Sequence, residues 1–282
     1  MPRVHQVTIV GMGLIGGSLG MAIKRRHLAT TVVGLSRSPS TIRRAIQRGA
    51  IDTGTTDARR AVAAADLVIV ATPVDCIVPQ ALRLARWMRP GSLLTDVGST
   101  KAHIVMTLER RLPRHVTFVG GHPLAGSEQR GIAAATPRLF DGSLCIVTRT
   151  ARINRASLQR VTAFWKQVAR RVIVMSPRQH DRILAATSHV PHLLAFSLVA
   201  ASSPMRLPWA PPSFVEMTRV AKSDPDLWDD IFLTNREALL VMMDRFEQHW
   251  RVLRTLIARR DHTTLRRVLR RAHSLRYALH DH

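Results

Sequence analysis

The chain has 282 residues, which exceeds the usual single-domain length of roughly 100 to 200, so two domains are expected. Its hydrophobic fraction of 46% excludes an intrinsically disordered protein. No apolar run reaches the roughly 18 residues that a membrane span needs, and the first strand-like segment begins too near Met1 for a signal peptide. We therefore predict a cytoplasmic protein with no membrane partner.

The formal net charge of +23 comes mainly from arginine. Such basicity is often the mark of a nucleic-acid partner, but it also arises when arginines are spread over solvated helix faces, and we favour this second interpretation. Part of the charge can serve anionic small molecules. The two cysteines, Cys76 and Cys145, lie in or beside apolar strand-like runs, which is typical of buried thiols in a reducing compartment and supports neither a disulfide nor a thiol-bound metal.

Short apolar runs alternate with helical patterns through the first half of the chain. Strands are predicted at residues 7–10, 31–36, 66–73, 93–99, 116–121 and 144–149. Crossover helices are predicted at residues 14–26, 39–49 and 74–88. Because the runs are rich in Val, Ile and Leu without strict alternation, the strands are expected to be buried on both faces of a mostly parallel sheet.

The second half is mainly helical. Helices are predicted at residues 154–170, 176–201 and 223–260, with a last strand at 171–175 and a loop at 202–214. Pro191 is expected to kink the second of these helices, and the long third one is suited to packing against a second copy of the chain. The predicted fold class is therefore α/β, with a Rossmann-type domain over residues 1–174 and an all-helical dimerisation domain over residues 175–282.

A glycine-rich loop follows the first predicted strand. In "VTIVGMGLIGGS", Gly11, Gly13 and Gly16 have the G-x-G-x-x-G spacing between a strand and a helix, where free backbone N–H groups and the helix dipole favour a dinucleotide pyrophosphate. The predicted cofactor-binding residues are Gly11, Gly13, Leu14, Ile15, Gly16, Ser36, Arg37, Thr72 and Pro73.

The end of the second strand bears on the choice of dinucleotide. Enzymes selective for NAD usually carry an acid about 20 residues after the glycines, but here Ser36 and Arg37 occupy that place. An arginine can bind a 2′-phosphate through a charge-assisted bond, so NADP is favoured over NAD. The alternative is that Arg37 is merely exposed and Ser36 caps the next helix.

Two polar residues follow later strands. Ser99 ends the strand in "LLTDVGSTK" and His122 ends the one in "VTFVGGHPLAG". Ligands of doubly wound sheets bind beyond the carboxyl ends of the strands, so both side chains are expected to face the reactive ring of the cofactor. Oxidation of a carbinol needs an acceptor for the hydroxyl proton, which histidine provides near neutral pH, and Ser99 can orient its imidazole.

Five segments together resemble a known family. "GMGLIGGSL", "DVGSTK", "GGHPLAGSEQRGI", "HDRILAATSHVPHLLAFSL" and "MTRVAKSDPDLWDDIFLTN" are similar, in this order, to signatures of prephenate dehydrogenases and the related arogenate and cyclohexadienyl dehydrogenases of tyrosine biosynthesis. The resemblance spans residues 5–255. It implies an oxidative decarboxylation in which hydride leaves C4 of a cyclohexadienol for NADP or NAD, CO₂ leaves C1, and an aromatic ring forms.

The resemblance also assigns roles. It implies that His122 is the catalytic histidine bonded to the C4 hydroxyl and Ser99 its partner, and that His192, Arg219 and Ser188 bind a small dianionic substrate. Bidentate binding of carboxylate by a guanidinium agrees with the role of Arg219. The chain departs from the family before Arg219, where "PWAPPSFVEMTR" replaces a usually glycine-rich loop, and this leaves the choice between prephenate and arogenate open.

The same residues admit other interpretations. His122 can simply fix its loop by hydrogen bonding to backbone carbonyls, and His189 can be a core histidine. His180 and Asp181 can be residues of a helix end, and whether they also face the cleft is left open. No metal site is predicted, because His189 and His192 lack a third ligand at suitable spacing. A β-hydroxyacid dehydrogenase would normally carry a catalytic lysine on the helix that follows the domain junction, and the helix predicted at residues 176–201 has no lysine.

A nucleic-acid-binding, nucleotide-sensing protein is the non-enzyme alternative. Its support would come from the arginine-rich segment at residues 258–277. The arginines of this segment recur on more than one helix face and lack interleaved aromatic residues, which favours a solvated end segment.

Overall fold

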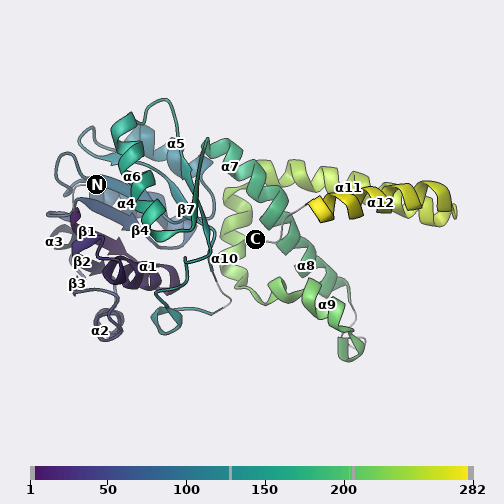
Figure 1. Ribbon diagram of the computed structural model, residues 1–282, viewed down its shortest axis with the longest axis horizontal. Coiled ribbons are helices and arrows are strands. Elements are labelled where there is room, and N and C mark those ends of the chain that lie inside the picture. The colour runs from purple at the N-terminus through teal and green to yellow at the C-terminus, as the bar shows by residue number, and fades with distance from the viewer. Residues whose placement is uncertain (1–3, 127–128, 203, 205–206, 279–282) are drawn as a thin grey trace. The chain divides into compact units, whose positions relative to one another are not determined.

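The computed structural model describes residues 4–126, 129–202, 204 and 207–278 (Figure 1). The chain forms two compact units, one that ends at Arg236 and one that begins at Glu237. The first unit contains all the strands that the structure describes and the helices up to α10. Everything that bears on the candidate site lies in this first unit.

The first unit is built around a six-stranded parallel sheet. Its strands are β1 (Val4–Val10), β2 (Ala29–Leu35), β3 (Thr53–Thr55), β4 (Leu67–Val70), β5 (Leu93–Asp96) and β6 (Thr117–Phe118). They lie in the order β3-β2-β1-β4-β5-β6, and every neighbouring pair is parallel. This is the Rossmann order, so the predicted fold class is confirmed, and the strand order reverses between β1 and β4. The short strand β3 was not predicted.

A separate three-stranded sheet follows. It contains β7 (Gly121–Pro123), β8 (Leu144–Thr148) and β9 (Arg171–Met175), with β7 antiparallel and β9 parallel to β8. The strand predicted at residues 116–121 is therefore two strands in two sheets. The chain passes between them at two glycines, and a Cβ on Gly121 would lie 2.7 Å from Nε1 of Trp165. The packing at this point tolerates no side chain, and His122 follows directly.

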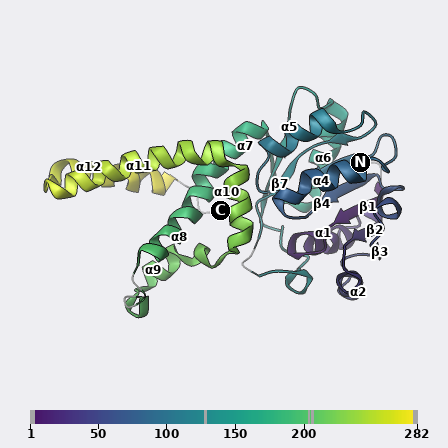
Figure 2. The ribbon, with the colours of Figure 1, turned by 180° about the vertical axis from the view of Figure 1, so that it is seen from behind.

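Helices cover the parallel sheet on both faces (Figure 2). They are α1 (Leu14–Arg25), α2 (Pro39–Gln47), α3 (Ala58–Val62), α4 (Val74–Ala85), α5 (Ala102–Arg111) and α6 (Arg155–Val168). One hydrophobic cluster joins α1 and α6 to residues such as Ile9, and the other joins α4 and α5 to residues such as Val10 and Val68. Neighbouring strand residues thus enter opposite cores, as the continuous apolar runs predicted.

The remaining part of the first unit is helical. It contains α7 (Pro177–Leu184), a π-helical turn η2 (Ala185–His189), α8 (Val190–Ala201), η3 (Leu207–Trp209), α9 (Pro212–Met217), η4 (Arg219–Lys222) and α10 (Pro225–Thr234). Ser176 caps α7 by accepting from the backbone N–H of Gln179. Pro191 has no N–H to donate to a preceding carbonyl, and the interruption expected near it takes the form of the π-helical turn just before it. The segment predicted as a loop at 202–214 holds η3 and the start of α9.

The prediction of a single helix at residues 223–260 is wrong. Helix α10 ends at Thr234, Asn235 leaves the helical conformation, and α11 (Arg236–Ala258) begins at the next residue. Asn235 is buried, and its Nδ2 donates to the backbone oxygen of Asp181 on α7. The break is fixed by this distant contact, which a hydrophobic period does not reveal.

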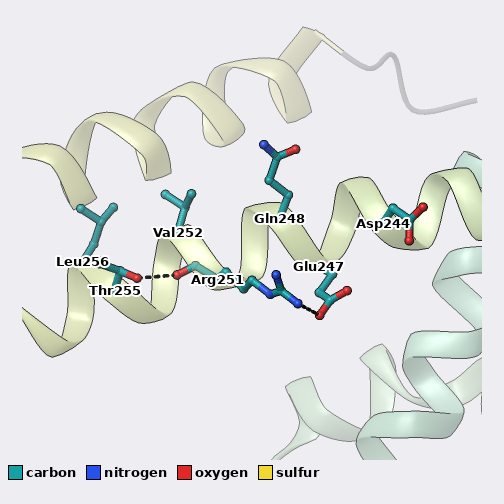
Figure 3. A pocket seen from close by; sticks show the side chains of 7 residues that line it. All are labelled: Asp244, Glu247, Gln248, Arg251, Val252, Thr255 and Leu256. Atoms are coloured by element: carbon teal, nitrogen blue, oxygen red, sulfur yellow. Dashed lines mark hydrogen bonds and ion pairs between the residues drawn. The ribbon is translucent and has the colours of Figure 1, made fainter.

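The second unit consists of the rest of α11 and of α12 (His262–Ala278). Residues of α11 line a groove, where Glu247 pairs with Arg251 and Val252 and Leu256 supply apolar surface (Figure 3). Helix α12 has no buried residue in its described length, and Leu269, Leu275 and Tyr277 are exposed. The unit therefore leaves much apolar surface open.

Contrary to the sequence-based expectation, one helical segment is long and apolar enough to cross a membrane by length and composition. It runs from Pro177 to Ala201 and includes α7, η2 and α8. Its buried face carries His180, Asp181 and His189, which hydrogen bond to other elements of the first unit. We assign it as a helical segment of the folded unit.

Candidate active site

The glycine loop lies at the carboxyl end of β1, where the strand order reverses. Gly11 has φ +97°, and a Cβ on it would lie 2.5 Å from the backbone oxygen of Ala71. A Cβ on Gly16 would lie 1.9 Å from the backbone oxygen of Gly11, so this glycine permits close packing of helix on strand. A Cβ on Gly13 would meet nothing within 4 Å, which leaves open space beside the start of α1.

This open space fits a dinucleotide pyrophosphate. No side chain caps the start of α1, so the first N–H groups at Leu14, Ile15 and Gly16 remain available for an anion. Oγ1 of Thr72 is buried and has no hydrogen-bond partner within the described chain, and Cγ2 of the same residue borders Gly11. Exposed Pro73 follows at the start of α4. The structure thus brings these predicted cofactor residues together, and an orphaned hydroxyl there suits a polar ligand.

Ser36 and Arg37 follow the end of β2. Ser38, rather than Ser36, caps α2 by accepting from the N–H of Thr41, so the alternative role weighed for Ser36 is wrong. The hydroxyl of Ser36 accepts from the N–H of Ser38 instead. Arg37 is exposed. Burial raises the pKa of Cys76 in the first turn of α4, and the positive charge of Arg37 opposes this rise.

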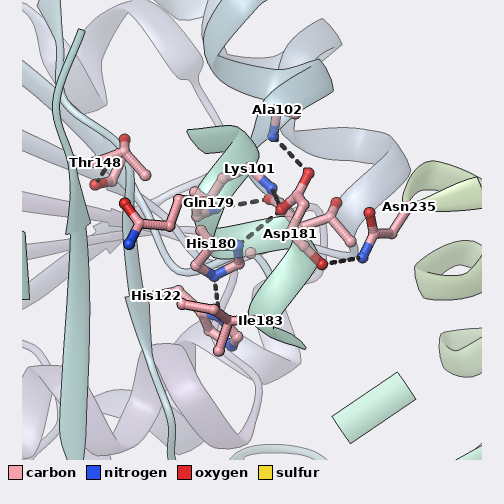
Figure 4. A network of polar contacts seen from close by, with 12 residues as sticks. Lys101, Ala102, His122, Thr148, Gln179, His180, Asp181, Ile183 and Asn235 are labelled. Carbon is pink, nitrogen blue, oxygen red and sulfur yellow. Dashed lines mark hydrogen bonds and ion pairs between the residues drawn. The ribbon is translucent and has the colours of Figure 1, made fainter. Parts of the chain in front are cut away.

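Three side chains form a chain of hydrogen bonds that links β7 to α7 (Figure 4). Nδ1 of His122 lies 2.8 Å from Nε2 of His180, and Nδ1 of His180 lies 2.7 Å from Oδ1 of Asp181. All three residues are buried, His122 with 8% of its surface exposed. His122 comes from β7, whereas His180 and Asp181 come from α7, so the site forms where the Rossmann part meets the helical part of the first unit.

Asp181 also fixes the start of α5. Its Oδ1 accepts from the N–H of Lys101 and its Oδ2 from the N–H of Ala102, both at 2.8 Å. The carboxylate therefore caps α5 and holds His180 at the same time. One buried side chain thereby joins the start of α5 to α7.

A buried ion pair supports the same region. The ammonium of Lys101 contacts the carboxylate of Asp96, and both side chains are fully buried. Asp96 also accepts from the N–H of Gly98 at 2.9 Å and of Gly121 at 3.1 Å, and Lys101 donates to the oxygen of Thr100 at 2.9 Å. With its lone pairs satisfied, the pair fixes the backbone directly before His122.

The electrostatics keep the imidazoles neutral. Burial, followed by the charges of His180, Lys101 and His189, holds the pKa of His122 well below its usual value. Burial also lowers the pKa of His180, although the hydrogen bond to Asp181 opposes this effect. Burial lowers the pKa of His189 to about 4, and its Nδ1 lies 3.0 Å from Nδ2 of Asn235. Neutral imidazoles can accept a proton, as a general base must.

A second cluster surrounds His192 on α8. Its Nδ1 donates to the backbone oxygen of half-buried Ser188 at 2.8 Å, and its ring stacks on Trp228 of α10. Exposed Arg219 starts η4, which packs against α8, and its charge acts on the pKa of His192. The structure therefore places His192 and Arg219 on neighbouring elements, and their binding of a substrate carboxylate stays a prediction.

Ser99 is half-buried just beyond β5. The hydrogen-bond partner of the His122 imidazole in the described structure is His180, and the role of Ser99 stays a prediction.

The chain matches two family models in sequence. Residues 19–174 match the prephenate dehydrogenase nucleotide-binding domain, and residues 176–271 match the prephenate dehydrogenase dimerization domain. The chain belongs to the prephenate dehydrogenase family. The family membership predicted from the five sequence segments is confirmed.

Individual members of the prephenate dehydrogenase family agree over nearly the whole chain. A cyclohexadienyl dehydrogenase of Zymomonas mobilis is 35% identical over 99% of this chain and 97% of its own length. A prephenate dehydrogenase of Bacillus subtilis is 33% identical over 97% of this chain and 76% of its own length. The crystal structure of prephenate dehydrogenase from A. aeolicus with hydroxyphenyl propionate and NAD+ has a TM-score of 0.89 at 33% identity, covering 97% of this chain and 98% of that one.

Sequence reasoning missed several residues of this family member's site. Lys101, Asp96 and Asn235 were assigned no role, and His180 and Asp181 were left undecided. The available signal was charge: "DVGSTK" and "HD" place ionisable residues where the hydrophobic pattern predicts burial, and a buried charge needs a partner. Within the described part of the chain, no group of three or more His, Cys, Asp or Glu residues is arranged to hold a metal ion.

Proposed function

We propose that the protein is a prephenate dehydrogenase, which converts prephenate into 4-hydroxyphenylpyruvate and CO₂ in tyrosine biosynthesis. The observation that carries this proposal is the position of the His122 imidazole in β7, where the Rossmann part meets the helical part of the first unit and Nδ1 is hydrogen bonded to His180. Burial holds the pKa of His122 well below its usual value, which favours the neutral ring that a base requires. Arogenate is the second substrate to test, because a cyclohexadienyl dehydrogenase is among the relatives.

His122 serves as the base in this proposal. When bound, the nicotinamide would be the oxidant, as acceptor of the C4 hydrogen of the substrate with its two bonding electrons. Nε2 of His122 holds the proton of the C4 hydroxyl while carbonyl character develops at C4. The bond from C1 to its carboxylate then breaks, its electron pair completes the aromatic ring, and the proton returns to the phenol oxygen. Positioned proton transfer of this kind contributes about 10²- to 10⁴-fold to a rate.

His192 and Arg219 bind the carboxylates of the dianionic substrate. A guanidinium offers two parallel N–H groups to a carboxylate and stays charged at any physiological pH. His192 is rigidly held by Trp228 and Ser188, so its Nε2 has a fixed direction. Ser188 would contact the substrate on this side of the site, and Ser99, which follows β5, would be the partner of His122.

NADP is the proposed cofactor, with NAD as the alternative. Gly11, Gly13, Leu14, Ile15 and Gly16 would hold the pyrophosphate, with Thr72 and Pro73 at the neighbouring strand end. Exposed Arg37 would pair with the 2′-phosphate of NADP, worth roughly 1.5 to 3 kcal/mol, while Ser36 would bond the ribose.

The remaining proposals concern assembly and location. We propose a Rossmann domain over residues 1–174 and a helical domain over residues 175–282 that forms a homodimer. The match of residues 176–271 to a dimerization domain and the open apolar surface of the second unit support the homodimer. The protein is proposed to be cytoplasmic, with no membrane or nucleic-acid partner.

A spectrophotometric assay tests the activity directly. Purified protein is mixed with NADP or NAD and with prephenate or arogenate, and reduced nicotinamide is followed by its absorbance. Prephenate should be oxidised in step with formation of 4-hydroxyphenylpyruvate. Absence of reduction with both cofactors and both substrates would overturn the proposal.

Two variants test the residue roles in the same assay. His122→Asn should lower kcat about 10²- to 10⁴-fold with cofactor affinity unchanged. Arg219→Ala should mainly raise KM, because it removes a contact made equally in the ground state and the transition state. Normal turnover by both variants would show that the site is elsewhere.

A further inference from the structure

The three-residue chain from His122 to Asp181 has a defined direction. Oδ1 of Asp181 accepts from the backbone N–H of Lys101 and lies 2.7 Å from Nδ1 of His180. A carboxylate has no proton to donate, so Nδ1 of His180 carries the hydrogen of this bond. A neutral His180 then has only a lone pair at Nε2.

The tautomer of His180 determines which nitrogen of His122 carries a proton. Nε2 of His180 lies 2.8 Å from Nδ1 of His122, and a lone pair at His180 must be met by an N–H of His122. With its single proton on Nδ1, a neutral His122 has its lone pair on Nε2. The backbone contacts of Asp181 with Lys101 and Ala102 keep the first member of the chain in place.

We infer that His180 is a positioning residue for His122: anchored by Asp181, it fixes the tautomer of His122 in which Nδ1 carries the proton and Nε2 is the base. This inference rests on the proposed function of His122. His180 contacts neither substrate nor cofactor in this scheme. When His122 takes the substrate proton, its Nδ1–H remains bonded to a neutral ring backed by a carboxylate, which stabilises the imidazolium in the way a third group orients the base of a catalytic triad.

The geometry also excludes a loosely held base. His180 is fully buried, and its two ring nitrogens are both engaged, so it cannot turn without breaking a bond. The rings of His122 and His180 lie with centroids 5.1 Å apart and are tilted by 56°, which directs one ring nitrogen at the other rather than stacking the faces. Removal of His180 would leave the Nδ1–H of His122 buried without an acceptor and free the ring to flip.

Two substitutions separate this role from simple packing. His180→Leu removes both polar atoms, whereas His180→Gln keeps an amide that can accept from His122 and donate to Asp181. We expect His180→Leu to lower kcat about 10²-fold, with KM for substrate and cofactor unchanged, and His180→Gln to recover most of the loss. His103→Gln, a change at an exposed histidine on α5, is the matched control and should behave as the wild type.

The tautomer can be read without turnover. Nitrogen NMR of the full-length protein labelled at histidine, with cofactor bound, should find His122 protonated at Nδ1 and unprotonated at Nε2. An Nε2–H tautomer in the wild type, or wild-type kcat in His180→Leu, would overturn the inference. If the wild type oxidises neither prephenate nor arogenate, the proposed function fails, while the NMR measurement still decides the tautomer. If the leucine variant does not fold, the glutamine variant and the wild-type spectrum decide.

Discussion

The imidazole of His192 stacks on the indole of Trp228, with ring centroids 3.6 Å apart and planes 21° from parallel. Nδ1 of the same ring donates to the backbone oxygen of Ser188 at 2.8 Å. Only Nε2 is left for a ligand, and it carries a hydrogen only when the ring is protonated. Burial, opposed by the Ser188 bond and assisted by the charge of Arg219, lowers the pKa of His192, so the ring is neutral near pH 7 before substrate arrives.

Substrate binding should therefore take up a proton at His192. A lowered pKa means that the neutral ring dominates at neutral pH, and a carboxylate of the substrate favours the protonated ring. We predict that KM for prephenate rises as the pH increases above neutrality, by at most about tenfold per pH unit, whereas His192→Asn makes KM higher but flat. KM measured across this range in both proteins checks the prediction, and parallel curves would exclude His192 as the titrating group.

The glycine loop allows affinity and stability to be separated. We predict that Gly13→Ala leaves the thermal midpoint unchanged but weakens cofactor binding, because its Cβ enters the open space beside α1 without touching the protein. Gly16→Ala should destabilise the fold, since its Cβ would lie 1.9 Å from the backbone oxygen of Gly11. Thermal unfolding and cofactor titration of the two variants test this. A large loss of stability in Gly13→Ala would contradict the predicted space.

Local patterns were enough to predict most of the fold. Most strands of the parallel sheet can be predicted from their own apolar residues, without knowing which strand they pair with. The glycine loop can be predicted from the spacing of three glycines within six residues. Strand β3 was not predicted, because its three residues at the edge of the sheet contain no apolar run. The division of residues 116–121 into two sheets depends on packing against Trp165, which lies far along the chain.

The site was predictable only where one segment carries the signal. His122 stands out because it follows a strand, and His192 and Arg219 stand out through the family resemblance. The bond from His122 to His180 joins residues 58 positions apart, and that from Lys101 to Asp181 joins residues 80 apart. No periodicity links such pairs, so the support behind the base became visible only in the folded structure.

Cofactor choice depends on Arg37. We predict that the wild type has a higher kcat/KM with NADP than with NAD, and that Arg37→Ala reduces this preference by about tenfold or more, which corresponds to loss of a charge-assisted bond. Activity with NAD should change little, because NAD has no 2′-phosphate. Arg86→Ala, at an exposed arginine at the far end of α4, is the control. An unaltered preference after Arg37→Ala would end the assignment.

Acid should destabilise the first unit through His189. Its pKa is lowered by burial to about 4, so the folded protein prefers the neutral ring, whereas the unfolded chain binds a proton near the ordinary value of about 6.5. The stability from this group is present above the unfolded value and is lost as the pH falls from there towards the folded value, by about 3 kcal/mol at most. Urea unfolding at stepped pH values measures this loss.

His189→Asn isolates the effect from that of the other buried histidines. Asn retains an oxygen that can accept from Nδ2 of Asn235, the bond that the imidazole now makes at 3.0 Å, but it does not titrate. The variant should be less stable than the wild type at neutral pH, because the smaller side chain leaves space beside Trp228. Its stability should nevertheless fall less steeply with acid, so the two curves converge. Curves that stay parallel down to about pH 4.5 would mean that His189 is not the group whose protonation opposes folding.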